Sequence, residues 1–94
     1  MGEKEVEEYL YRQCKKRGWM CEKFTSPQRR SVPDRLITAP SFIGFVECKA
    51  PGKTATELQT RDHFRRIKLG FDVWIADSKP VVDAIIMQIE ERIK

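Results

Sequence analysis

The sequence contains only three cysteines and a single histidine, and this shortage excludes several kinds of site. Cys14, Cys21 and Cys48 are an odd number without a C-x-x-C pair. Neither a disulfide framework nor a structural zinc site, which needs about four clustered Cys or His ligands, is therefore expected. With His63 as the only histidine and no glycine-rich phosphate loop, Ser-His-Asp hydrolysis and P-loop chemistry are poorly supported. We expect no nucleotide cofactor and a reducing environment.

Long apolar runs and a signal peptide are missing as well. No stretch approaches the roughly 18–20 apolar residues that a membrane helix needs. The first ten residues, MGEKEVEEYL, are acidic and amphipathic, which is the opposite of a secretory signal. We expect a protein of the cytoplasm without a membrane partner. At 94 residues the chain forms one small domain, 1–94, whose limited core would gain stability from association between copies.

Charge is unevenly distributed along the chain. The net charge is only +4, but residues 1–8 hold four glutamates against one lysine. Residues 12–35 hold eight basic residues against two acidic ones, and a second basic cluster falls in 61–68. Such segregation is typical of a protein that binds a polyanion, although basic solvated faces are common in other proteins.

Hydrophobic periodicity and turn residues predict an α/β domain with the order α-β-β-β-α-β-α. The expected helices are 3–17, 55–69 and 81–93, and the expected strands are 19–24, 34–39, 42–50 and 71–76. Gly18 and Gly70 are predicted to end the first two helices. Thr54 and Glu57 match a T-x-x-E capping box, which predicts a helix that starts at Ala55. Residues 25–33 have no periodicity and are expected to form a basic loop, and residues 77–80 a turn.

Asp34, Glu47 and Lys49 form the constellation that could carry chemistry. Asp34 opens one arm of the predicted hairpin, and Glu47 lies near the end of the other. Glu47 and Lys49 are two residues apart in a strand, so their side chains project from the same face. Two carboxylates on an apolar face are costly unless a cation neutralises them, and Mg²⁺ is typically held by one or two carboxylates. Such a cation polarises a phosphoryl oxygen. The alternative is an ordinary hairpin with exposed charged ends.

These residues give the sequence a resemblance to a known group. V-P-D-R at 32–35, F-V-E-C-K-A-P-G-K at 45–53 and Gln59 resemble the PD-(D/E)xK nuclease superfamily. Within it, the chain is similar over nearly its whole length to the small stand-alone, phage-type form of the VRR-NUC (virus-type replication-repair nuclease) family. The resemblance implies a restriction-endonuclease-like fold, a mixed central sheet flanked by helices. It also implies a host cytoplasmic location if the protein is phage-encoded.

The resemblance implies roles for individual residues. Asp34, Glu47 and the main-chain carbonyl of Cys48 match the positions that hold Mg²⁺ or Mn²⁺, and Lys49 matches the catalytic lysine. Gln59 matches a glutamine on the following helix that is expected to contact the water or phosphate. The superfamily often adds a glutamate from the first helix. Either Glu3 or Glu7 could fill this position, because they lie four residues apart on one helical face.

Several other side chains are candidates for DNA contact or for the core. Arg29, Arg30 and Arg35 flank Asp34, and we expect them, together with Lys53, to contact DNA phosphates. His63 lies four residues after Gln59 on the same helical face and is expected to be a partly exposed helical histidine, with a catalytic or ligand role as the alternative. Trp19 and Trp74 fall within predicted strands and are expected in the core.

The sequence thus predicts a Mg²⁺- or Mn²⁺-dependent endonuclease that hydrolyses phosphodiester bonds in DNA. No segment resembles a base-reading helix, so selectivity for DNA structure is favoured over selectivity for sequence. We expect a homodimer that acts on branched DNA such as four-way (Holliday) junctions, because two symmetric incisions need two sites. The alternatives are a monomeric flap or nicking nuclease, a non-catalytic DNA-binding module, and an assembly subunit.

Overall fold

A computed structural model describes residues 2–94 and has the predicted order of elements, α-β-β-β-α-β-α. The helices are α1 (Glu3–Lys16), α2 (Glu57–Lys68) and α3 (Lys79–Arg92). The strands are β1 (Met20–Lys23), β2 (Arg35–Ala39), β3 (Phe42–Cys48) and β4 (Asp72–Ala76). Within residues 2–94, no helix is both long enough and apolar enough to cross a membrane.

The four strands form one mixed sheet in the order β1-β2-β3-β4. The pairs β1–β2 and β2–β3 are antiparallel, whereas β4 runs parallel to β3. A parallel pair needs a long crossover connection, and α2 supplies it. The prediction of a mixed central sheet flanked by helices is confirmed.

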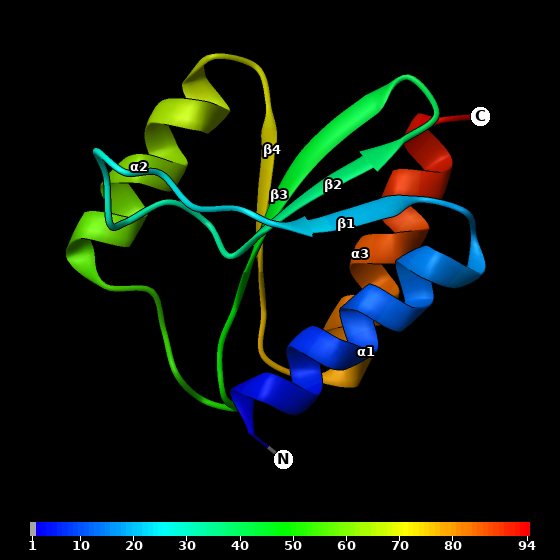
Figure 1. Cartoon of the computed structure of the whole chain (residues 1–94), viewed down its shortest axis with the longest axis horizontal. Coiled ribbons are helices and arrows are strands. Elements are labelled where there is room, and N and C mark those ends of the chain that lie inside the picture. Colours follow the sequence, from blue (N-terminus) through cyan, green and yellow to red (C-terminus); the bar gives the residue numbers. More distant parts are fainter. Residues whose placement is uncertain (1) are drawn as a thin grey trace.

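Helices α1 and α3 lie side by side on one face of the sheet, and α2 lies on the opposite side next to β4 (Figure 1). The hydrophobic core lies between the sheet and the α1–α3 pair, where Leu10, Val46 and Ile89 are fully buried. Trp19 belongs to this core, as expected, and Trp74 packs against its edge.

The two faces of β3 serve different purposes. Val46 and Cys48 point into the core shared with α1 and α3. Phe45 and Glu47 alternate with them and point toward α2, where the ring of Phe45 lies 4.9 Å from the guanidinium of Arg66. Strand alternation therefore separates an apolar face that stabilises the fold from a face that carries charged groups.

Two helix starts differ from the predictions. Thr56, not Thr54, caps α2: its hydroxyl accepts from the backbone N–H of Gln59, and the side chain of Gln59 accepts from the N–H of Thr56. The predicted capping box, Thr54 with Glu57, is therefore placed two residues too early. A capping box accepts Gln as well as Glu at its fourth position, and Thr56 with Gln59 forms it here. Helix α3 starts at Lys79 within the predicted turn, since Ser78 caps it and Pro80 fits the first helical turn.

Other boundaries agree to within a few residues. Gly18 and Gly70 end α1 and α2 with φ angles of 76° and 97°, in the left-handed region that favours glycine. Asp34 directly precedes β2, and Lys49 directly follows β3. Pairing nevertheless continues beyond β3, because the N–H of Lys49 donates to the carbonyl of Ala76 at 2.9 Å.

Candidate active site

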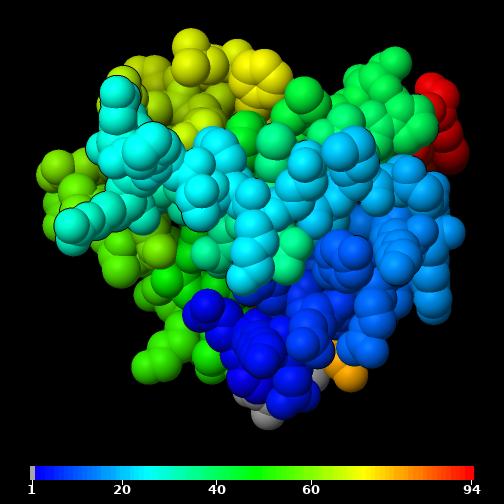
Figure 2. Space-filling model, in the orientation of Figure 1, coloured from blue at the N-terminus to red at the C-terminus, as the bar shows by residue number. Residues whose placement is uncertain are grey.

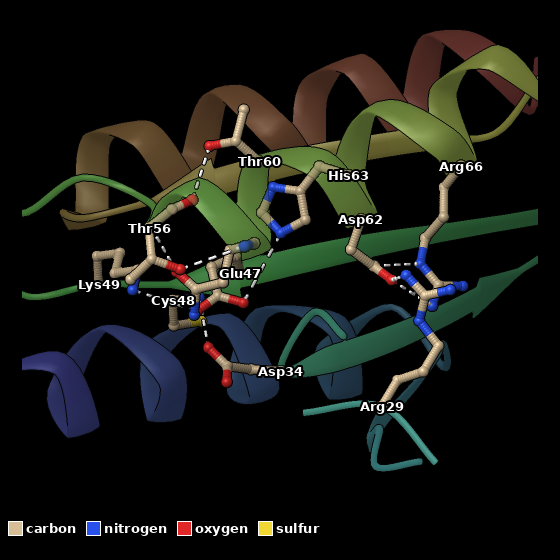
Figure 3. A network of polar contacts seen from close by, with 11 residues as sticks. Arg29, Asp34, Glu47, Cys48, Lys49, Thr56, Thr60, Asp62, His63 and Arg66 are labelled. Carbon is tan, nitrogen blue, oxygen red and sulfur yellow. Dashed lines mark hydrogen bonds and ion pairs between the residues drawn. The ribbon is translucent and has the colours of Figure 1, made fainter. Parts of the chain in front are cut away.

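The hairpin brings Asp34 and Glu47 together. In the antiparallel register Arg35 pairs with Val46, so the preceding Asp34 lies beside the following Glu47. The backbone N–H of Cys48 donates to Asp34 Oδ2 at 2.7 Å, which fixes this carboxylate at the end of β3 (Figure 3). The two carboxylates named by the sequence motif are therefore neighbours in space.

Glu47 is almost fully buried on the α2 side of the sheet. Its side chain is 4% exposed, and its Oε2 atom accepts a hydrogen bond from Gln59 Nε2 at 3.0 Å. Lys49 Nζ lies 3.6 Å from the same oxygen, in agreement with the prediction that Glu47 and Lys49 share a face. The other oxygen, Oε1, is buried without a hydrogen-bond partner. The carboxylate is thus held at one oxygen and left unsatisfied at the other.

This environment changes the acidity of Glu47. Burial, and after it the negative charge of Asp34, raise the pKa of the Glu47 carboxyl to about 7, although the ammonium of Lys49 acts in the opposite direction. A pKa near neutrality means that the ionised form is poorly compensated by the protein alone. The site therefore has a deficit of positive charge.

The donor set fits a hard divalent cation. The candidate ligands are the carboxylates of Asp34 and Glu47 together with the main-chain carbonyl of Cys48, all of them oxygen donors. Within residues 2–94, no three or more His, Cys, Asp or Glu side chains group closely enough to hold a metal ion by themselves. Mg²⁺ sites usually keep several waters and take only one or two carboxylates, so a pair is sufficient. The unpartnered Oε1 of Glu47 is the observation that fits a cation best.

Neither glutamate predicted from the first helix, Glu3 or Glu7, joins Asp34 and Glu47 in the structure. Glu3 is exposed to solvent. Glu7 turns inward, but its Oε2 accepts a hydrogen bond from Arg35 Nε at 2.7 Å. Arg35 also donates to the carbonyl of Cys21 at 2.9 Å. Glu7 and Arg35 therefore neutralise each other between α1 and the sheet.

Two of the arginines expected on DNA phosphates are paired with protein carboxylates. The side chain of Arg35 is only 12% exposed, because its donors are used by Glu7 and Cys21, and this corrects its assignment as a surface contact. Arg29 Nη2 lies 2.7 Å from Oδ1 of Asp62, which is fully buried on α2. Arg29 keeps a side-chain exposure of 38%, so it is anchored by Asp62 and still partly open to solvent.

Asp62 joins the basic loop, residues 25–33, to α2. Besides Arg29, it binds Arg66, whose Nε lies 2.8 Å from Oδ2. Arg66 in turn lies over the rings of Phe24 and Phe45, with 5.1 and 4.9 Å to their centres. The loop stands out from the surface beside α2, as the cyan segment of Figure 2, and it leads directly into Asp34. Fixing the loop through Asp62 therefore also fixes the approach to Asp34.

The remaining basic candidates stay open to solvent. Arg30 and Lys53 are both exposed. An open hollow of about 350 Å³ runs from the basic loop to Asp34 and is lined in part by Thr25, Ser26 and Arg30. Hydroxyl and guanidinium donors next to a carboxylate pair suit a phosphate group.

His63 differs from its prediction as a partly exposed residue. It is buried on the α2 face that meets the sheet, and its Nε2 lies 3.9 Å from Glu47 Oε1. Burial lowers the pKa of His63, as do the charges of Arg66 and Lys49, while Asp62 raises it. Gln59, one turn earlier, contacts Glu47 and caps α2 rather than pointing into open solvent.

Asp62 is the site residue that sequence reasoning missed. It lies three residues after Gln59 and four before Arg66, on the face of α2 that Gln59 and His63 share. An acid at this spacing, within a helix whose basic residues outnumber its acids, was the available signal. Periodicity alone could not show that Arg29 would reach it from the loop.

Comparisons with known proteins identify the family, although no protein-family model matches the chain. The chain is 46% identical over 78 residues to the putative nuclease p44 of Acyrthosiphon pisum secondary endosymbiont phage 1, over 82% of this chain and 84% of that protein. It also superposes on a solved VRR_NUC domain with a TM-score of 0.85 and 30% identity, over 90% of this chain and 94% of the other. The fold described above agrees with the structural match. The chain belongs to the VRR-NUC family of nucleases.

Proposed function

We propose that the protein is a divalent-metal-dependent DNA endonuclease. The observation that carries the proposal is the pair of adjacent carboxylates, Asp34 and Glu47, with Lys49 beside them and one buried oxygen of Glu47 unsatisfied. A binding module has no use for two carboxylates that face a phosphate, because they repel it. Membership in a nuclease family supports the same conclusion.

The residues of the site would have different roles in hydrolysis. Asp34, Glu47 and the Cys48 carbonyl would hold Mg²⁺ or Mn²⁺, which when bound polarises a phosphoryl oxygen and lowers the pKa of a water. The Lys49 ammonium, 3.6 Å from Glu47, is placed to orient the attacking water or to stabilise charge that develops on the phosphate. Gln59 keeps the Glu47 carboxylate in place through its hydrogen bond.

We further propose that phosphates reach the site along the basic loop. Arg30 and Lys53 are exposed, and Arg29, although paired with Asp62, keeps 38% of its side chain exposed. The hollow between this loop and Asp34 gives a backbone phosphate a route lined with donors.

We further propose that two copies of the chain form a homodimer that cleaves DNA junctions. Four large apolar side chains near α2 and the edge strand β4 are 41–61% exposed: Phe64, Ile67, Phe71 and Ile75. An open hollow of about 220 Å³ lies among three of them, between α2 and β4. Apolar residues gathered on one side suit a two-fold interface, which would bring two identical sites to a branched DNA.

Removing either carboxylate should abolish cleavage but leave DNA binding intact. For Asp34→Asn and Glu47→Gln we expect nicking of supercoiled plasmid in Mn²⁺ to fall roughly a thousandfold or more, because several kcal/mol of charge stabilisation are lost. EDTA should have the same effect on the wild type. Glu57→Gln, at an exposed position of α2, is the matched control and should cleave normally. Cleavage near the wild-type rate in either site variant would contradict the assignment.

The free energy of unfolding of the metal-free protein should show how much the ionised Glu47 carboxylate destabilises the fold. A carboxyl with a raised pKa in the folded state stabilises the fold below pH 4.5, and this stability is lost as the pH rises to about 7. In EDTA at pH 8, Glu47→Gln should therefore be more stable than the wild type by about 1–3 kcal/mol, with little difference at pH 5.

Thermal denaturation measures this difference, with Glu57→Gln again as the control. Mn²⁺ should then raise the melting temperature of the wild type but not that of Glu47→Gln. Equal stability of Glu47→Gln and the wild type at pH 8 would show that the buried carboxylate is not under-compensated.

The exposed and the paired basic residues should behave differently on DNA. Arg30→Ala and Lys53→Ala should each weaken binding to a duplex and reduce the salt dependence by about one phosphate contact. Arg35→Ala should instead lower the melting temperature, because it leaves the half-buried Glu7 with only the exposed Lys23, 3.9 Å away, as a partner. Lys16→Ala, an exposed lysine on α1, controls for net charge. If the salt dependence of binding is unchanged in both Arg30→Ala and Lys53→Ala, phosphates do not approach the site along the basic loop.

The two-fold interface is tested by one substitution on each side of the molecule. Phe64→Glu should convert a dimer to a monomer in sedimentation, whereas Met87→Glu, at an equally exposed apolar position on α3, should not. On a cruciform plasmid the dimer should give linear product in one encounter, and Phe64→Glu should give nicked product. A monomeric wild type that only nicks the plasmid, or that prefers flaps, would contradict the junction proposal.

A further inference from the structure

Two buried polar atoms without partners face each other at the edge of the active site. They are Nε2 of His63 and Oε1 of Glu47, 3.9 Å apart, in side chains that are 8% and 4% exposed (Figure 3). A buried polar group without a partner costs roughly 1–3 kcal/mol, and two in direct opposition are unusual in a small domain. Their arrangement calls for an explanation beyond packing.

Helix α2 presents one donor group to each oxygen of Glu47. Gln59 binds Oε2 at 3.0 Å, and His63, one turn later on the same face, points at Oε1. The capping box holds Gln59 at the start of the helix, and Asp62, next to His63, ties the helix to the basic loop. Both side chains are therefore carried by a segment whose position is fixed at several points.

We propose that His63 is a positioning residue for Glu47, a role that rests on the metal-dependent function proposed above. With its proton on Nε2, the imidazole donates to one lone pair of Glu47 Oε1, leaves the other lone pair for a cation and, together with Gln59, prevents the carboxylate from rotating. The present separation exceeds a hydrogen bond of 2.7–3.2 Å by about 0.7 Å. Active-site hydrogen bonds are often long in the unliganded state and shorten when the site is loaded. The residue does not itself touch the phosphate.

The role needs one hydrogen-bond donor on Nε2 and no positive charge. A neutral imidazole carries one N–H and one bare nitrogen, and the side chain of His63 is only 8% exposed. A neutral donor can hold a carboxylate without cancelling the negative charge that a cation requires. Partners that orient a ligating carboxylate typically change metal affinity by about 10- to 100-fold when they are removed.

The single histidine makes the proposal directly observable by NMR. In ¹⁵N-labelled wild-type protein, the only imidazole spectrum belongs to His63. We expect the Nε2–H tautomer, and we expect exchange of this proton with water to slow as Mg²⁺ is added, because the hydrogen bond to Glu47 shortens. A proton on Nδ1 with Nε2 bare in the Mg²⁺-loaded protein would overturn the proposal.

Two substitutions separate positioning from packing. His63→Leu keeps the volume but lacks a donor, and calorimetry should give a Mn²⁺ dissociation constant about tenfold higher than that of the wild type. His63→Gln can donate and should restore the affinity to within about threefold, a rescue that a packing role would not produce. Unchanged Mn²⁺ affinity in a folded His63→Leu protein would overturn the proposal.

The same measurements keep this inference separate from the proposed function. A wild type that binds Mn²⁺ while His63→Leu binds it equally well rejects only the role of His63. A wild type that binds neither Mn²⁺ nor Mg²⁺ rejects the metal-dependent function and, with it, the positioning role. Should His63→Leu fail to fold, the NMR tautomer of the wild type decides the question.

Discussion

The burial of the Glu47 carboxylate beside Asp34 is the constraint on which the rest of the site depends. Taking an ionised group out of water is costly unless hydrogen bonds and opposite charge compensate for it. Here the compensation comes from one hydrogen bond, from Gln59, and from the ammonium of Lys49, and one oxygen is left unsatisfied. A carboxyl whose pKa rises to about 7 is the result. The fold thus tolerates a local cost at the place where a cation would be of most use.

The alternation of side chains along β3 confines this unfavourable burial to one face of the sheet. One face of the strand, with Val46 and Cys48, is fully buried against α1 and α3 and contributes to the main core. The other face carries Glu47 toward α2, outside that core. Because the two sets of residues alternate along one strand, the strand that anchors the domain also positions the carboxylate. Precise placement follows from a rigid central element rather than from a loop.

Basic residues in this protein serve two separate purposes. Arg35 binds the half-buried Glu7 and ties α1 to the sheet. Arg66 binds the buried Asp62 within α2 and packs that helix over the rings of Phe24 and Phe45. Arg30 and Lys53 remain exposed and are available to an anionic partner. Arg29 stands between the two groups, since Asp62 anchors it while more than a third of its side chain stays open. The number of basic residues therefore overstates the number of cations available to an anionic partner.

The sequence by itself determined the α/β order and the neighbouring Asp34, Glu47 and Lys49, because alternation and hairpin pairing are local rules with short range. The mixed sheet was implied by the family resemblance and not by these rules, since β4 pairs with β3 through a crossover. Only the tertiary structure decided the partners of side chains that meet across 28 or more residues, such as Arg35 with Glu7 and Arg29 with Asp62. It also decided that His63 is buried against Glu47. The angle at which α2 packs on the sheet fixes that contact, and no local pattern in the helix encodes it.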